Sequence, residues 1–390
     1  MKIIFNLKEL NITQSGKTTI DRYGNVLSNR TLNSILSFIV KKYTYSKYEM
    51  AQISAVDIQH ISAEYKIYLT HLYNTGVILW NEYKPGVKYR GYYLTDFFKN
   101  RATILKIELE KDDTEIVKEK YNNDIDKSVD IKLRTDFKSL QIVDAKIEKE
   151  VLINSEDVFI YNFKGYIASF KNLQMIKEKN IYYKWTSGRL YTNFCSCGKK
   201  VRLNNFDFSG DKLGTLDIPS SHPLWLAIWA IEKGVDKHDY DFKMYCNDVS
   251  RLKIYDTIRV QLNKIKDIGS AGDDMKAKAA PYYSRATSKI AFMKWINGEE
   301  KNDIVNNMFK IYYETLYKIV DRKKYKMYDE LVKLETNFIM NIVVKELYKI
   351  RGIKIITCHD QIYFQEKYKE KVEEIWNIEL EKIYEKLPML

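Results

Sequence analysis

Two segments decide the fold: residues 213–226, which read LGTLDIPSSHPLWL, and residues 353–364, which read IKIITCHDQIYF. The first is a short apolar run that ends at Asp217 and is followed at once by the start of a helix. The second has two β-rich runs around a tight His359-Asp360 turn, which is the pattern of a hairpin with its aspartate at the tip. We therefore expect a sheet that presents one carboxylate at each of two strand ends.

Carboxylates at neighbouring strand ends can hold divalent cations. Asp217 and Asp360 could share two ions about 4 Å apart, one activating a 3′-hydroxyl and the other holding the leaving pyrophosphate. Taken singly, each aspartate is more often a helix cap or a turn residue, and the flanking pattern of both segments favours the metal site. We expect Mg²⁺, with Mn²⁺ as the alternative.

A third segment lies between these two and carries a pair of cations. Residues 285–293 read RATSKIAFM, so Arg285 and Lys289 stand four residues apart on one helix face. This spacing suits two cations that grip one triphosphate, although such a pair is also a common surface feature. A fourth segment, SGRLYT at residues 187–192, lies upstream.

In this order the segments resemble the palm and fingers of family A DNA polymerases and of the related single-subunit phage RNA polymerases. The resemblance covers roughly residues 185–370. LDIPSSHPL is similar to motif A, Asp-Tyr-Ser-Gln-Ile-Glu, and RATSKIAFM is similar to motif B, Arg-x-x-x-Lys-x-x-x-Phe. CHDQIYF resembles motif C with its His-Asp pair, and SGRLYT resembles the Thr-Gly-Arg-Leu-Ser-Ser segment. In its overall sequence character the chain also resembles short phage and mobile-element polymerase-like proteins.

The resemblance implies a role for each matching residue. Asp217 and Asp360 would bind metal, and Lys289 would also act as a general acid toward pyrophosphate. The remaining implied contacts are with the incoming nucleotide, by Arg285, Lys289, His222 and Met293, and with the primer-template, by Arg189 and His359.

Several positions depart from the family pattern. Motif A has Pro219 in place of Ser and His222 in place of Glu, motif B has Met293 in place of Phe, and motif C has Gln361 in place of Glu. In DNA polymerases the motif A Glu, at the position of His222, helps to exclude a 2′-hydroxyl, whereas RNA polymerases have Gly at that position. The ring of His222 favours steric exclusion, so dNTP is expected over NTP. Glu335 is a candidate for an additional acid near the site, although a position on a helix surface is the expectation.

Residues 1–98 have the pattern of a winged helix-turn-helix domain. Apolar spacing predicts a helix around residues 32–40, a second over residues 62–76 and a hairpin over residues 77–94. Three basic residues of the hairpin would contact DNA phosphates: Lys84, Lys88 and Arg90. The alternative is a protein-contact module that binds no DNA.

Composition agrees with a nucleic-acid partner but does not require one. The net charge of +12 favours a polyanion, because neutralised phosphates release counterions. No apolar run reaches 18 residues, so no membrane partner is expected, and four Cys form no disulfide framework. These features favour the cytoplasm. Gly272-Asp273-Asp274 is expected to be a loop, and Cys195 with Cys197 is not expected to bind zinc.

The sequence therefore predicts an α/β protein with three parts. These are a winged-helix-like domain over 1–98, a helical, thumb-like linker over 99–184, and a right-hand polymerase palm with reduced fingers over 185–390. The expected activity is template-dependent transfer of a (d)NTP onto a 3′-hydroxyl in phage or mobile-element replication, with replication proteins as possible partners. Two alternatives stay open: a primase or RNA polymerase on the same palm, and a non-catalytic DNA-binding replication initiator.

Overall fold

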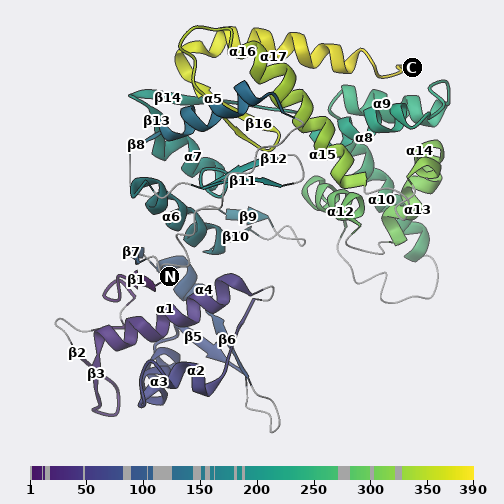
Figure 1. Cartoon of the computed structure of the whole chain (residues 1–390). Coiled ribbons are helices and arrows are strands. Elements are labelled where there is room, and N and C mark those ends of the chain that lie inside the picture. The colour runs from purple at the N-terminus through teal and green to yellow at the C-terminus, as the bar shows by residue number, and fades with distance from the viewer. Residues whose placement is uncertain are drawn as a thin grey trace.

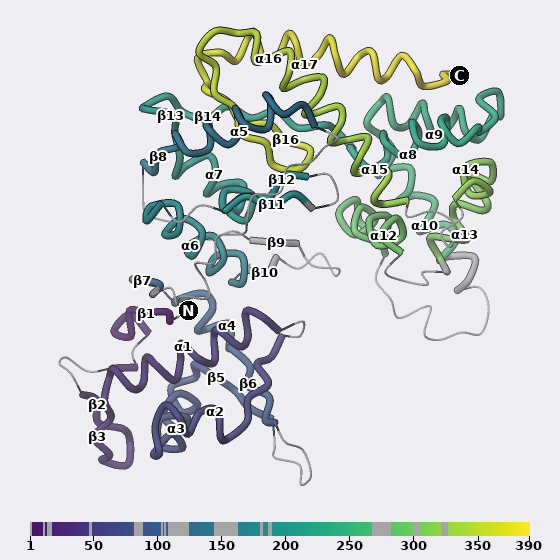
Figure 2. Tube along the Cα trace, viewed as in Figure 1, coloured from purple at the N-terminus to yellow at the C-terminus, as the bar shows by residue number. Residues whose placement is uncertain are grey.

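The computed structural model shows a mixed α/β protein of 390 residues. It describes residues 2–10, 12–13, 18–46, 49–81, 89–102, 104–108, 125–143, 151–153, 159–161, 163–179, 182–186, 189–270, 282–298, 303–320 and 327–390. The first hundred residues gather in one lobe, and the C-terminal helix lies at the far end of the molecule (Figures 1 and 2). No described helix is long and apolar enough to cross a bilayer.

The N-terminal lobe alternates short strands with helices. Its elements are β1 (Lys2–Phe5), β2 (Thr18–Ile20), β3 (Val26–Ser28), α1 (Asn29–Tyr45), β4 (Ala51–Ile53), α2 (Ala55–Gln59), α3 (Tyr65–Asn74), β5 (Ile78–Trp80), β6 (Arg90–Leu94), α4 (Asp96–Arg101) and β7 (Ile104–Glu108). Strand β6 pairs with both β4 and β5, β2 pairs with β3, and β1 pairs with β7. Helix α1 begins where the Ser28 hydroxyl accepts a hydrogen bond from the Thr31 amide.

The predicted helices and hairpin of this lobe are present. The helix expected over residues 62–76 begins later, at Tyr65, and a separate short helix, α2, precedes it. Strands β5 and β6 form the expected antiparallel pair, and Arg90 is the first residue of β6. Lys84 and Lys88 lie outside the described residues.

A five-stranded antiparallel sheet forms the centre of the rest of the chain. Its order is β15 (Ile355–Cys358), β16 (Gln361–Gln365), β14 (Asp211–Asp217), β13 (Phe206–Phe208) and β8 (Gln141–Ile142). Two further hairpins are β9 (Val151–Ile153) with β10 (Phe159–Tyr161), and β11 (Tyr183–Thr186) with β12 (Arg189–Thr192).

Helices surround this sheet and extend from it on one side (Figure 1). They are α5 (Lys127–Lys138), α6 (Phe163–Lys177), α7 (Lys199–Asn205), α8 (Ser221–Glu232), α9 (Tyr240–Ser250), α10 (Ile254–Ser270), α12 (Arg285–Asn297), α13 (Asp303–Tyr312), α14 (Glu314–Ile319), α15 (Met327–Thr336), α16 (Lys345–Leu347) and α17 (Lys369–Tyr384). A π-helical segment, Asn337–Val344, joins α15 to α16, and a 3₁₀ turn, Glu366–Tyr368, precedes α17.

The buried side chains form two hydrophobic cores. The first contains N-terminal residues up to Ile107 together with Phe163, Tyr166 and Ile167 of α6, so it extends past the predicted boundary at residue 98. The second contains the sheet and the later helices, and it includes side chains of α5 and of the end of α6. The predicted linker over 99–184 therefore contributes to both cores. Gly272-Asp273-Asp274 lies outside the described residues.

Candidate active site

Asp217 and Asp360 lie side by side at one end of the sheet. Asp217 is the last residue of β14 and is paired with Gln361, the residue that follows Asp360. The Ile218 amide donates a hydrogen bond of 3.2 Å to the Asp360 carbonyl oxygen. The structure thus brings together two aspartates that are far apart in the sequence.

Local backbone geometry fixes this arrangement. His359 and Asp360 form a two-residue turn between the paired residues Cys358 and Gln361, and His359 adopts the left-handed conformation with φ of 59° that such turns require. Gly214 faces Phe364 across β14 and β16, where an added Cβ would come within 2.7 Å of the ring. The sheet therefore needs glycine here to keep the register that places Asp217 beside the turn.

The environment of Asp360 disfavours its negative charge. Burial, followed by the charges of Glu335 and Asp217, raises the pKa of Asp360 to about 7. A carboxyl group in such a position gains stability from a proton or from a bound cation. The pair therefore has the electrostatic character of a cation site.

The side chain of Gln361 is hydrogen-bonded to Asp217. Its side-chain Nε2 donates a hydrogen bond of 3.0 Å to Asp217 Oδ2. Its Oε1 accepts hydrogen bonds from the Tyr363 hydroxyl at 2.7 Å and from Arg202 at 3.5 Å. These two donors fix which end of the amide faces Asp217.

Glu335 belongs to this site, and its expected position on a helix surface was wrong. Its side chain is only 1% exposed on α15, because the apolar faces of the surrounding elements enclose it. Arg189 Nε donates to Glu335 at 2.9 Å, the Arg189 Nη2 also contacts this carboxylate, and the Ser221 hydroxyl donates to it at 2.6 Å. Arg189 is itself buried, so in this structure its charge is committed to Glu335.

The two histidines of the site are held neutral. Burial and the nearby charge of Arg189 lower the pKa of His222 and of His359 to about 4, with Lys289 also acting on His222 and Arg202 on His359. The His222 ring stacks on Tyr328, with centroids 6.0 Å apart. The His359 ring packs edge-on against Tyr191 at 5.2 Å.

The predicted cation pair approaches the site from α12. A capping box of Ser284 and Thr287 starts this helix, and its exposed face carries Arg285 and Lys289. Both cations lie 5.7 Å from the ring centre of Tyr255 on α10. Burial raises the pKa of Tyr255, the charge of Arg285 lowers it and that of Asp360 raises it, so this ring lies within electrostatic range of both. Met293 is half-buried against the second core.

Asp217 and Asp360 are the residues that could hold a divalent cation such as Mg²⁺. Magnesium in phosphoryl-transfer enzymes is commonly held by one or two carboxylates, with phosphate oxygens and water completing its shell. Asp217 and Asp360 supply two such carboxylates. Among the described residues, no group of three or more His, Cys, Asp or Glu side chains is arranged to bind a metal. Cys195 and Cys197 are both buried, and neither forms a disulfide bond.

The chain matches no protein-family model, and neither the curated proteins nor the solved structures yield a match.

Sequence reasoning missed part of the site. Tyr255, Tyr328 and Ser221 carry no motif, and 31 tyrosines in the chain hide the two that matter. Glu335 had a usable signal, because it is an acid inside the apolar stretch LVKLETNFIM, residues 331–340. An acidic residue in such a stretch is buried with a partner more often than it is solvated there.

Proposed function

We propose that the chain is a nucleotide polymerase that adds nucleotides to a 3′-hydroxyl by metal-assisted nucleotidyl transfer. The observation that carries the proposal is the pair Asp217 and Asp360, which occupy adjacent strand ends where Asp360 has a pKa raised to about 7. Two carboxylates held close together repel each other, and a bound cation or a shared proton removes this repulsion. Mg²⁺ bound there would activate the 3′-hydroxyl and neutralise the charge of the leaving pyrophosphate.

The cations of α12 complete the chemistry in this proposal. Arg285 and Lys289, which both lie 5.7 Å from the ring centre of Tyr255, would bind the triphosphate. Phosphoryl transfer depends mainly on positioning and on stabilising charge that develops on phosphate oxygens, and two cations one helical turn apart supply both. In this proposal Lys289 would also protonate the leaving pyrophosphate.

Backbone strain supports the location of the site. Of the five non-glycine residues in the left-handed region among the described residues, two flank the carboxylates, namely His359 with φ of 59° and Ser220 with φ of 52°. Such conformations cost of order 1–3 kcal/mol each and persist where the surrounding structure enforces them, which happens most often at functional sites. Each of the two stands next to an element that carries a proposed metal ligand.

The template and the product of the proposed enzyme follow from other features. In this proposal DNA is the template, held partly by the basic residues Arg90, Lys84 and Lys88 of the N-terminal part of the chain. Steric exclusion by His222 favours dNTP as the substrate. RNA synthesis on the same palm is the alternative, since a neutral imidazole can also accept or donate a hydrogen bond to a 2′-hydroxyl.

A non-catalytic DNA-binding role has one observation in its favour. Arg189, the residue expected to support the primer-template, is buried in an ion pair with Glu335. A chain that keeps this pair closed in the presence of DNA would bind nucleic acid without assembling a complete site.

Primer extension tests the proposal directly. Purified full-length chain is given a primed DNA template with Mg²⁺ or Mn²⁺ and either dNTPs or NTPs. We expect extension by the wild type, none by Asp217→Asn or Asp360→Asn, and wild-type extension by Glu374→Gln, a control on the exposed face of α17. Extension that survives both aspartate substitutions would reject the site, and DNA binding without any extension would favour the initiator role.

A further inference from the structure

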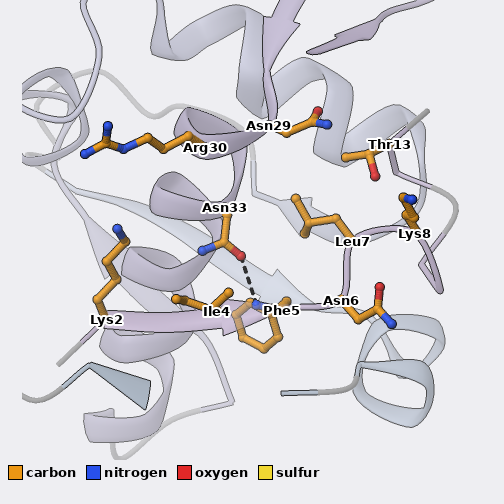
Figure 3. Close-up of a pocket in the computed structure, with 10 residues that line it drawn as sticks. All are labelled: Lys2, Ile4, Phe5, Asn6, Leu7, Lys8, Thr13, Asn29, Arg30 and Asn33. Atoms are coloured by element: carbon orange, nitrogen blue, oxygen red, sulfur yellow. Dashed lines mark hydrogen bonds between the residues drawn. The ribbon is translucent and has the colours of Figure 1, made fainter. Parts of the chain in front are cut away.

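A hollow lies in the N-terminal lobe, away from the carboxylates. Its volume is about 370 Å³, and it opens between β1 and the first turns of α1 (Figure 3). The volume is within the range of small-ligand sites. Figure 3 shows that its wall is built from both elements and from the segment that follows β1.

The lining of the hollow is cationic and apolar. Lys2, Lys8 and Arg30 carry its charge, and none of the ten lining residues is acidic. Strand alternation explains the apolar part, because Ile3 is fully buried in the first core while Ile4 is partly exposed toward the hollow. The hollow therefore suits a ligand that is anionic and also has an apolar surface.

The charges stand at opposite ends. In Figure 3 Lys2 and Arg30 lie on one side, Lys8 lies on the other side, and the side chains of Ile4 and Leu7 lie between them. A ligand that satisfies both ends must carry negative charge on both sides of an apolar or aromatic part.

The floor of the hollow is fixed before any ligand binds. Asn33 of α1 accepts a hydrogen bond from the Phe5 amide at 2.9 Å and donates one to the Ile3 carbonyl at 3.0 Å. The Ser37 hydroxyl accepts from the Ile3 amide at 2.6 Å. These bonds attach β1 to α1, so the lining has little conformational freedom to lose on binding.

We propose that this hollow binds one nucleotide unit of a single-stranded nucleic acid. Each nucleotide within a strand has a phosphate on its 5′ and its 3′ side, which matches cations at both ends of an apolar floor. A free nucleotide carries its phosphates on one side only and would leave Lys8 or the pair Lys2 and Arg30 unused. This inference goes beyond the proposed polymerase activity and does not depend on Asp217 or Asp360.

Binding of a fluorescein-labelled oligothymidylate, measured by fluorescence anisotropy without divalent cations, tests the proposal. The variant is Lys8→Ala/Arg30→Ala, and the matched control is Lys66→Ala/Lys371→Ala, which removes the same charge from two other exposed positions. Each phosphate contact on a single strand contributes about 0.7 to the slope of log affinity against log salt, so we expect the variant to lower the slope by about 1.4. The same relation gives a loss of about 25-fold at 0.1 M salt relative to 1 M salt, with little change in the control.

Further arms separate the possible occupants. The charge-preserving variant Lys8→Arg/Arg30→Lys should retain binding, and circular dichroism should show the alanine variant to be folded. Oligothymidylate containing 4-thiothymidine should form photocrosslinks to peptides from residues 2–33.

Three results would overturn the proposal. The alanine variant could bind like its control, dTTP or inorganic polyphosphate could compete as strongly as the oligonucleotide, or crosslinks could occur only within residues 189–390. Absence of primer extension together with the expected binding results would remove the polymerase proposal and leave this one standing.

Discussion

The side-chain amide of Gln361 donates a hydrogen bond of 3.0 Å to Asp217, although 144 positions separate the two residues. The bond exists because β14 and β16 pair with Asp217 opposite Gln361. In motif C of the polymerases that the sequence resembles, the position of Gln361 is occupied by Glu. The neutral amide therefore gives Asp217 a hydrogen-bond donor where a glutamate would add a further carboxylate to those of Asp217, Asp360 and Glu335.

Gln361→Glu should weaken the proposed activity and increase its dependence on Mg²⁺. One carboxylate oxygen would accept from Tyr363 and Arg202, as Oε1 does now, and the other would face Asp217 with no proton between them. Because Asp217 and its bond to Gln361 are exposed, we expect a modest loss of stability without divalent cations, about 0.2–1 kcal/mol. Urea unfolding with and without Mg²⁺ checks this, and equal stability of variant and wild type in EDTA would contradict it.

Asp360 should make the stability of the chain depend on pH. Its pKa is about 7 in the folded chain and near 3.9 when unfolded, so the folded state holds the proton more tightly. The contribution is fully present below about pH 4 and is lost as pH rises through 7, by on the order of 2–4 kcal/mol.

Asp360→Asn should remove this dependence and unfold at a higher temperature than the wild type at pH 8. Thermal unfolding from pH 5 to 8 without divalent cations measures it, with Glu374→Gln as the control. A variant that is less stable than the wild type at pH 8 would mean that Asp360 is not under electrostatic stress.

Arg189 and Glu335 should show strong coupling in a double-mutant cycle. Glu335→Leu alone leaves Arg189 buried without its partner, and we expect a loss of about 3–5 kcal/mol. Arg189→Met with Glu335→Leu removes both charges, so the double variant should be more stable than the sum of the single losses predicts. Equilibrium urea unfolding provides the four free energies, and additive losses would show that the two side chains do not interact.

Lys289→Ala should lower the rate of nucleotide addition more than Arg285→Ala does. Arg285 already shares its charge with Asp256 at 3.3 Å, so its loss should act mainly on nucleotide affinity, whereas Lys289 would act on the leaving pyrophosphate. Steady-state kinetics of extension separates kcat from KM. Lys310→Ala, an exposed lysine on neighbouring α13, is the control, and wild-type kinetics in both site variants would make the motif B resemblance accidental.

His222 should set the sugar preference together with Tyr328. The stacked rings lie 6.0 Å apart, so His222→Gly should admit ribonucleotides more readily, and Tyr328→Leu should have a smaller effect in the same direction. Because burial and Arg189 lower the pKa of His222 to about 4, the preference should not change between pH 6 and pH 8. Competition between dATP and ATP in primer extension measures it. A wild type that already prefers ATP would show that His222 does not exclude the 2′-hydroxyl.

Local patterns in the sequence were sufficient for the elements around the site. The helix after Asp217, the His359-Asp360 turn and the helix of Arg285 are all present. Each depends on spacing within about a dozen residues, where hydrophobic periodicity and turn chemistry are strong signals.

Features that depend on tertiary packing could not be predicted in this way. The ion pair of Arg189 with Glu335 joins residues 146 positions apart. Burial of Glu335 depends on how α8 and β12 cover α15, which no local pattern encodes. The boundary at residue 98 was missed for the same reason, since β1 pairs with β7 and α6 packs back onto the first core.

Helix α6 has a consequence for how the chain unfolds. Its first half places Phe163, Tyr166 and Ile167 in the first hydrophobic core, and its second half places Leu173 and Ile176 in the second. An unbroken helix of 15 residues cannot release one half without weakening the other. The two cores should therefore unfold in one cooperative transition, which would give a single calorimetric peak. The substitution Ser169→Pro, which breaks α6 in the middle, should split that peak into two.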